Sequence, residues 1–199
     1  MCGSGTPAIE AALIARRRAP GILRPRFTFM GIRGFGDRDP ALEASPRQMW
    51  LSLRSAARAG ERAEGLPPII ATDIDPDAIV LSKQNAEDAG VEADIAFDAC
   101  DFAYTPIPAK PGVVFLNPEY GARMGNATEL ESLYFRIGDF FKQRCQGYQG
   151  YVFTGNMELS RKIGLRSARR LTFFNGPIEC RLIGFDLYTG TRRKDKPAD

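Results

Sequence analysis

The sequence predicts an α/β protein with a doubly wound, mostly parallel sheet that ends in an antiparallel pair of strands. Short apolar runs alternate along the chain with longer segments of helical periodicity, which is the order of a parallel sheet with crossover helices. The last two apolar runs, residues 169–174 and 178–188, are joined by Asn-Gly-Pro, which is typical of a tight antiparallel turn. With 199 residues, 44% of them hydrophobic, we expect one domain over 1–190 and a basic, disordered tail at 191–199.

A helix is expected directly after the glycine-rich start of the chain. Apolar residues recur at helical spacing over 7–18. Residues 20–46 combine prolines, glycines and arginines, so we expect an irregular insertion there. A second helical pattern covers 46–64, and the sequence Gly-Leu-Pro-Pro at 65–68 stops it.

The middle of the chain predicts a strand, a helix and a further strand. Residues 69–75 form a short apolar run that ends in acids, which suits a buried parallel strand whose carboxyl end meets a ligand. The helix expected over 76–90 starts with a proline and closes on a glycine. We assign Asp75 and Asp77 to the capping and the dipole of that helix. Residues 93–102 alternate as a strand does.

The remaining elements continue the same alternation. Residues 112–121 form an apolar strand that breaks into a loop, and 129–145 form an amphipathic helix. A strand is expected at 150–155 and a short helix at 158–163. The antiparallel pair then completes the predicted sheet.

The composition excludes several kinds of site. The chain has no histidine, so a Ser-His-Asp triad, a Cys-His dyad and His-based metal sites are excluded. Its four cysteines are scattered without a Cys-x-x-Cys pair, which indicates neither a zinc site nor a disulfide framework and favours a reducing, cytoplasmic compartment. The sequence has no apolar run of about 18 residues, so we expect no membrane insertion.

The net charge of +3 is modest, but basic residues cluster at 16–26, 161–170 and 192–196. A polyanionic partner is one interpretation of these clusters, and a solvated surface is the other. Three phenylalanines lie among the arginines of the insertion, and contact with RNA or apolar anchoring of the loop are the two interpretations that stay open for Phe27, Phe29 and Phe35.

Polar residues follow the predicted parallel strands, at the edge where open α/β sheets bind ligands. A glycine loop followed by an acid at the end of the next strand places N–H groups near one part of a nucleoside ligand and Asp73 near its ribose. The loop lacks the third spaced glycine of the dinucleotide fingerprint, so a ligand with a ribose and no phosphate fits better. We expect S-adenosylmethionine, with its methionine end at the loop, its adenine near Ile74 and its exocyclic amine at Asp101. The candidate contacts are Cys2, Gly3, Ser4, Gly5, Thr6, Asp73, Ile74, Asp101, Phe102 and Asn117.

The sequence Asn-Pro-Glu-Tyr-Gly at 117–121 resembles the Asn/Asp-Pro-Pro-Tyr motif of amino-group methyltransferases, with Glu119 in the place of the second proline. The segments MCGSGT, IEAAL, APGILR, ATDIDPDAI, NPEYGARMG and NGPIECRL are similar to the catalytic domain of the THUMP-containing ribosomal RNA large-subunit guanine-N2 methyltransferases of the K/L-like type. This resemblance covers nearly the whole chain. It implies a Rossmann-like methyltransferase fold and 23S ribosomal RNA as the substrate.

The resemblance also implies roles for three residues. Asn117 and the carbonyl of Pro118 would accept hydrogen bonds from the target amine, and Tyr120 would stack on the flipped base. An exocyclic amine is a poor nucleophile, so the main task is to orient its lone pair at the sulfonium methyl, which needs no histidine. The alternative is an ordinary turn at Asn117 with a half-buried Tyr120. Glu119 either accepts a donor on guanine or faces solvent.

Two features of the family have no counterpart at the start of the sequence: the first strand, with its terminal acid before the loop, and the THUMP domain. We therefore expect a gap at the centre of the sheet, and we expect Met1 to be either an internal methionine of a longer protein or a misassigned start. The sequence leaves two other functions open. One is an adenine-N6 methyltransferase that acts on DNA or RNA, and the other is a catalytically inactive fragment or RNA-binding remnant.

Overall fold

The computed structural model describes residues 1–36, 44–118, 127–188 and 190. The chain divides into two compact units, Cys2–Ala99 and Met1 together with Cys100–Asp199. We call them the N-terminal unit and the C-terminal unit. The expected tail at 191–199 lies outside the described residues, and the single domain over 1–190 stays a prediction.

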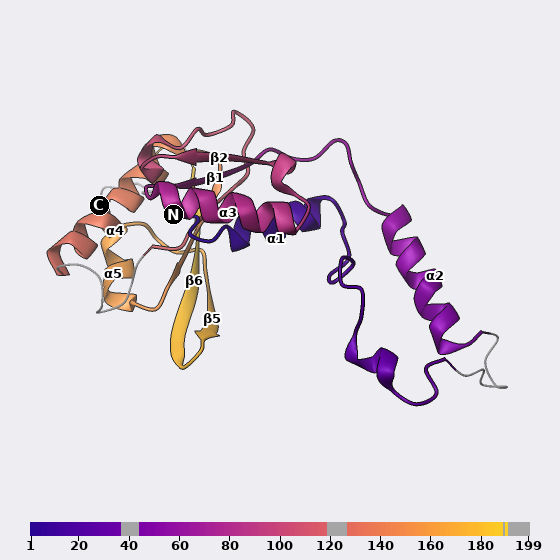
Figure 1. The fold of residues 1–199 in the computed structure, drawn as a ribbon. Coiled ribbons are helices and arrows are strands. Elements are labelled where there is room, and N and C mark those ends of the chain that lie inside the picture. Colours follow the sequence, from indigo (N-terminus) through magenta and orange to yellow (C-terminus); the bar gives the residue numbers. More distant parts are fainter. Residues whose placement is uncertain (37–43, 119–126, 189, 191–199) are drawn as a thin grey trace, which may run out of the picture. The chain divides into compact units, whose positions relative to one another are not determined.

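The N-terminal unit packs two helices against two parallel strands (Figure 1). The strands β1 (Ile69–Asp73) and β2 (Ile95–Ala99) pair with Ile69 opposite Ile95. The helices are α1 (Thr6–Ala15) and α3 (Pro76–Asp88), and a short 3-10 turn, η2 (Glu92–Asp94), precedes β2. Small and branched side chains close the core between them: Ile9, Ala12, Ala71, Ala86, Val91 and Ile95.

The insertion between α1 and β1 holds a 3-10 turn, η1 (Thr28–Gly31), and the helix α2 (Pro46–Ala59). Its aromatic rings pack on one another, because Phe27 and Phe29 both lie edge-on to Trp50 at centroid distances of 5.3 and 5.1 Å. Phe35 lies edge-on to Phe29 at 5.5 Å. Among the described residues these rings therefore pack within the insertion. This packing supports apolar anchoring of the loop as the role of the three phenylalanines.

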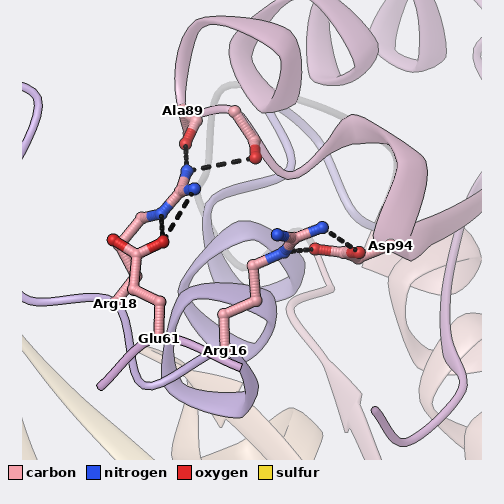
Figure 2. Close-up of polar contacts among 6 residues, drawn as sticks. Arg16, Arg18, Glu61, Ala89 and Asp94 are labelled. Carbon is pink, nitrogen blue, oxygen red and sulfur yellow. Dashed lines mark hydrogen bonds and ion pairs between the residues drawn. The ribbon is translucent and has the colours of Figure 1, made fainter. Parts of the chain in front are cut away.

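Two arginines of the first basic cluster form structural ion pairs (Figure 2). Arg16, just after α1, binds both carboxylate oxygens of Asp94, with Nη2 at 2.7 Å from Oδ1. Arg18 pairs with Glu61 at 3.1 Å and donates to the carbonyls of Ala89 and Gly90. These contacts tie the end of α1 to η2 and to the end of α3, so Arg16 and Arg18 are engaged within the unit.

The C-terminal unit contains a four-stranded sheet in the order β3-β4-β6-β5. Its strands are β3 (Val113–Leu116), β4 (Gln149–Thr154), β5 (Arg169–Asn175) and β6 (Ile178–Asp186). The pair β3–β4 is parallel, whereas β4–β6 and β5–β6 are antiparallel. The hairpin β5–β6 confirms the expected antiparallel pair and appears in Figure 1 as two long yellow arrows.

Three helical elements accompany this sheet: η3 (Phe102–Tyr104), α4 (Ala127–Arg144) and α5 (Met157–Lys162). The core joins aromatic residues of α4 to the sheet, with Tyr134, Phe141, Val152 and Ile183 almost fully buried. Gly138 of α4 allows a very close approach, because a Cβ there would lie 2.0 Å from the carbonyl oxygen of Ile163. The short helix α5 therefore packs directly on the backbone of α4.

Hydrogen bonds connect the strands into two sheets, β1-β2 and β3-β4-β6-β5. Among the described residues one sheet lies in each unit, and the gap expected at the centre of a single sheet stays a prediction. Within the part of the chain that the structure describes, no helix is both long and apolar enough to cross a bilayer.

Candidate functional site

The glycine-rich start of the chain folds over the carboxyl end of β1. The N–H of Cys2 donates to the carbonyl of Thr72 at 3.0 Å, and the N–H of Gly3 donates to Oδ2 of Asp73 at 2.9 Å. Gly5 turns the chain into α1 with φ at +82° and donates its N–H to the carbonyl of Cys2 at 2.9 Å. The predicted loop and the predicted acid are therefore in direct contact.

The loop also lies tightly against α3. A Cβ at Gly5 would meet the Cβ of Ser82 at 2.7 Å, so the helix and the loop fit only because Gly5 has no side chain. The amide of Asn85 donates to the carbonyl of Ser4 at 2.9 Å. On the other side, Gly3 and Ser4 are exposed and nothing lies within 4 Å of a Cβ placed at Gly3. The loop thus presents an open surface beside Asp73.

The carboxylate of Asp73 is half-buried and accepts a second backbone N–H, from Asp75 to Oδ1 at 3.1 Å. Burial raises the pKa of Asp73, whereas the N–H groups of Gly3 and Asp75 are among the groups that lower it, and the pKa lies below its usual value. Asp73 is therefore ionised at neutral pH and suits hydroxyl donors such as a ribose diol. Ile74 follows it with 71% of its surface exposed, as an apolar face beside that carboxylate.

The other side chains of the loop are polar but not nucleophilic. The Sγ of Cys2 lies 3.9 Å from the Oγ of Ser82, and burial raises the pKa of this thiol, so it stays protonated at neutral pH. The hydroxyls of Ser4 and Thr6 lie 3.2 Å apart. Cys2 is therefore a candidate for contact with a ligand rather than for covalent catalysis.

Asp101 and Phe102 belong to the C-terminal unit, where Asp101 caps η3 by accepting the N–H of Ala103 at 2.9 Å. The Nη2 of Arg136 lies 2.7 Å from both oxygens of Asp101, and its guanidinium lies 5.1 Å from the centre of the Phe102 ring. Burial raises the pKa of Asp101, but Arg136 and the Ala103 N–H outweigh it and hold the pKa below its usual value. The sequence reasoning missed Arg136, because an arginine 35 residues away carries no signal that it will meet this acid.

Asn117 and Pro118 follow directly after β3. Asn117 is exposed, and no described residue forms a hydrogen bond with its amide. The ring of Pro118 is fully buried, which fixes the chain at this point. Glu119, Tyr120 and Gly121 lie outside the described residues, so the stacking role of Tyr120 stays a prediction.

The structure therefore brings together Cys2 to Thr6 with Asp73 and Ile74 in one unit, and Asp101 with Phe102 in the other. In the part of the chain that is described, no group of three or more His, Cys, Asp or Glu side chains is placed to hold a metal ion. The chemistry available in the described site consists of ionised carboxylates, an exposed amide and exposed backbone groups.

In this α/β chain a glycine loop contacts an acid at the end of one strand, and Asn-Pro follows a later strand. These are features of a methyltransferase domain. The family model of the RMKL-like methyltransferase domain matches residues 1–183, and the chain belongs to this family. The expected resemblance is confirmed. A curated relative, the ribosomal RNA large subunit methyltransferase K/L of Syntrophotalea carbinolica, is 37% identical over 193 residues, which cover 94% of this chain and 26% of the relative.

Solved structures confirm the Rossmann-like methyltransferase fold. A possible methylase from Clostridium difficile 630 aligns with a TM-score of 0.81 at 26% identity, over 96% of this chain and 48% of that one. SMU.472, solved in complex with SAH, aligns with a TM-score of 0.80 at 24% identity over 96% of this chain and 47% of that one, and at this identity the likeness shows the fold alone. The chain spans less than half the length of the curated relatives that it matches first.

Proposed function

We propose that the chain is the catalytic domain of an enzyme that transfers a methyl group from S-adenosylmethionine to the exocyclic N2 amine of a guanine in large-subunit ribosomal RNA. The observation that carries this proposal is the exposed Asn117 amide, held by the buried Pro118 at the carboxyl end of β3. It supports an amine acceptor in a chain whose family is one of methyltransferases. Relatives named for ribosomal RNA support the substrate.

The N-terminal unit offers groups that fit the methyl donor. Asp73, ionised and fixed by two backbone N–H groups, would accept hydrogen bonds from the ribose hydroxyls, and the exposed face of Ile74 would support the adenine. The open side of the loop at Gly3 and Ser4 would receive the methionine end. When bound, S-adenosylmethionine supplies an electrophilic methyl group on a sulfonium.

The C-terminal unit offers groups that fit the acceptor. The amide oxygen of Asn117 and the carbonyl oxygen of Pro118 would accept hydrogen bonds from the amine, which turns the nitrogen lone pair toward the methyl carbon. The N–C bond forms as the C–S bond breaks, the sulfur keeps the electron pair, and the amine releases a proton to water. No group in this scheme needs to act as a strong base, which is consistent with a chain without histidine.

The working environment follows from the same proposal. A ribosomal RNA partner would support a cytoplasmic location, and the four cysteines, all free thiols, are consistent with a reducing compartment. Arg136, which holds Asp101, is a further candidate contact at the edge of the site, because its side chain is 47% exposed.

Methyl transfer tests the proposal directly. The purified chain is incubated with labelled S-adenosylmethionine and unmodified 23S ribosomal RNA, and the RNA is digested and analysed by mass spectrometry. We expect N2-methylguanosine. Asn117→Ala should lower the transfer rate by about 100-fold or more, because the side-chain amide would orient the acceptor amine and is also a candidate contact of the donor.

Calorimetric titration separates the donor from the acceptor. Asp73→Ala should abolish binding of S-adenosylhomocysteine, whereas Asp88→Ala, an exposed carboxylate at the end of α3, should leave it unchanged. N6-methyladenosine as the product would contradict the assignment of guanine. If the folded chain bound no S-adenosylhomocysteine, this result would contradict the proposed methyltransferase activity and support the alternative of an inactive fragment.

A further inference from the structure

The turn of the hairpin β5–β6 lies at the same end of its sheet as Asn117. β3 and β4 run parallel, with Leu116 opposite Val152, and β6 returns antiparallel to β4, with Val152 opposite Ile183. The strand β5 then runs in the direction of β4, with Arg170 opposite Ile183. The carboxyl end of β3 and the turn after β5 therefore share one edge of this sheet.

The hairpin extends beyond the strand next to it. The last residue of β4, Thr154, pairs with Arg181, so Ile178, Glu179 and Cys180 pair with β5 alone. We call residues 173–178 the hairpin tip. Figure 1 shows this turn projecting from the other elements of the C-terminal unit.

The hairpin tip exposes apolar and aromatic side chains. Phe174 is 71% exposed, Phe173 45% and Ile178 49%. The ring of Phe173 lies edge-on to Phe153 at 6.2 Å, so part of it belongs to the sheet. No aromatic ring of the described residues packs on Phe174. An exposed ring at the end of a two-stranded arm is a surface for stacking.

The face of the hairpin that carries Phe174 holds two arginines, one of them ion-paired with a glutamate. Residues opposite one another in an antiparallel pair share a face, so Phe174 lies with Glu179, and Thr172 with Arg181. Arg181 donates to Thr172 and pairs with Glu179, which confirms that these side chains share a face. Arg170 lies on the same face further down β5, because successive residues alternate. Two cations and one acid therefore accompany the exposed ring.

The segment that leads into the hairpin adds further positive charge. Residues 161–170 contain five arginines or lysines and no acid. Lys162 is paired with Glu131, whereas Arg161, Arg166 and Arg169 are exposed and form no ion pair with described residues. An aromatic ring flanked by exposed cations is the combination by which proteins hold single-stranded nucleic acid.

We propose that the hairpin tip binds the single-stranded RNA next to the methylated base, with Phe174 stacked on one flanking base and Arg170 and Arg181 near its phosphates. This inference rests on the proposed function and names how the substrate is held. Phe174 lies three strand spacings from β3, about 14 Å, and four residues beyond the level of Leu116, about 13 Å. It is a binding residue for neighbouring nucleotides, at a distance from the reacting amine.

The physical reason for such a contact is the cost of exposing the target. A base must leave its stack before its amine can be methylated, and its neighbours lose stacking as well. A ring that stacks on one neighbour offsets part of this cost without reading the sequence, because every base has a π-face. The other two occupants of an exposed apolar tip, a second copy of the chain and another protein, offer the arginines no phosphate.

Three substitutions at Phe174 test stacking against mere apolar contact. The probe is a fluorescent 12-nucleotide RNA of uridines with one central guanosine, titrated into the 199-residue chain and followed by anisotropy. We expect Phe174→Ala and Phe174→Leu to weaken binding by about 5-fold to 150-fold, and Phe174→Tyr to keep the affinity of the original chain. Leu171→Ala, on the same strand but on the opposite face, is the matched control and should change nothing.

Other outcomes overturn the inference in distinguishable ways. Unchanged RNA binding by Phe174→Ala, or full rescue by Phe174→Leu, removes the stacking contact while methyl transfer by the original chain still supports the proposed function. A change in oligomeric state of Phe174→Ala, measured by light scattering, assigns the tip to a second copy. An original chain that neither methylates nor binds RNA overturns the proposed function, and this inference with it.

Discussion

At the scale of single residues, the fit of Gly5 against Ser82 determines whether the candidate site can form. Both Gly3 and Gly5 have positive φ, so an alanine at either position costs about 1–2 kcal/mol in backbone strain. Gly5 alone faces a contact, at 2.7 Å from the Cβ of Ser82. We expect Gly5→Ala to be destabilising by about 1–3 kcal/mol more than Gly3→Ala in urea unfolding.

A double variant separates this contact from the strain. Ser82→Gly alone costs about 1 kcal/mol, because glycine weakens a helix. Combined with Gly5→Ala it removes the atom that clashes, so the double variant should be more stable than the sum of the two single effects predicts. Strict additivity would show that backbone strain at Gly5, rather than packing on α3, sets the cost.

Residue types at strand ends could be predicted from the sequence, but their partners could not. The glycine loop and Asp73 lie together as expected, because a loop that precedes a helix and an acid that ends a neighbouring strand meet at the same edge. The sequence pointed to Asp101 as a candidate ligand contact, but it did not point to Arg136, whose guanidinium binds the Asp101 carboxylate. An ion pair across 35 residues depends on how α4 lies on η3, and no local pattern encodes that packing.

At the scale of elements, every predicted helix and strand in the described residues is present, and the differences lie at the ends. The first helix was expected to reach residue 18 but ends at Ala15, because Arg17 adopts a left-handed conformation with φ at 55°. A glycine usually occupies such a position, so the sequence carried no stop signal there. The second helix ends at Ala59 rather than at 64, and the strand expected at 93–102 is shortened to Ile95–Ala99 by the 3-10 turn before it.

The ion pair between Arg16 and Asp94 should make the packing of α1 on η2 sensitive to acid. The guanidinium of Arg16 lowers the pKa of Asp94 below its usual value, so the pair stabilises the fold fully at neutral pH and loses this effect as the pH falls through the lowered pKa. We expect Asp94→Asn to lower the free energy of unfolding by about 1–3 kcal/mol at pH 7. The difference in stability between the two proteins should therefore shrink as the pH falls below the usual pKa of a carboxyl group.

The matched control for this prediction lies on the same 3-10 turn. Glu92→Gln changes an exposed carboxylate and should leave the stability unchanged at both pH values. Urea unfolding of the three proteins at pH 7, 5 and 3 measures the effect. A difference between Asp94→Asn and the original chain that persists undiminished at pH 3 would mean that shape, not charge, holds the contact.

At the scale of the whole molecule, the fold class could be predicted from the order of helices and strands along the chain. Which strands pair with one another could not be predicted in the same way. The sequence predicted a mostly parallel sheet with an antiparallel end, and the described strands form one parallel pair in the N-terminal unit and a mixed sheet in the C-terminal unit. The order of helices and strands follows from local periodicity, which can be recognised in each segment of the sequence by itself. Ladder formation requires two strands, so the sequence could indicate the expected gap in the sheet only through the family resemblance.

The distribution of charge over the molecule gives a prediction for binding of the proposed RNA partner. With a net charge of only +3, a protein that bound RNA by overall charge would respond equally to the loss of any three cations. Each contact with a phosphate of single-stranded RNA contributes about 0.7 to the slope of log affinity against log salt. We expect the combined change of Arg166, Arg169 and Arg170 to Gln to reduce that slope by about 2.

A second triple variant with the same change in net charge provides the comparison. Arg26, Arg33 and Arg58 are exposed in the N-terminal unit and form no ion pair with described residues, and their change to Gln should leave the slope as it is. Anisotropy titrations at salt concentrations from about 50 to about 300 mM measure both slopes, because the screening of charges changes strongly over this range. Equal reductions would show that RNA responds to net charge alone, and a reduction confined to the second triple would place the RNA on the insertion. A reduction seen only with the change of Arg166, Arg169 and Arg170 would indicate phosphate contacts along residues 161–170. This segment leads into the hairpin β5–β6.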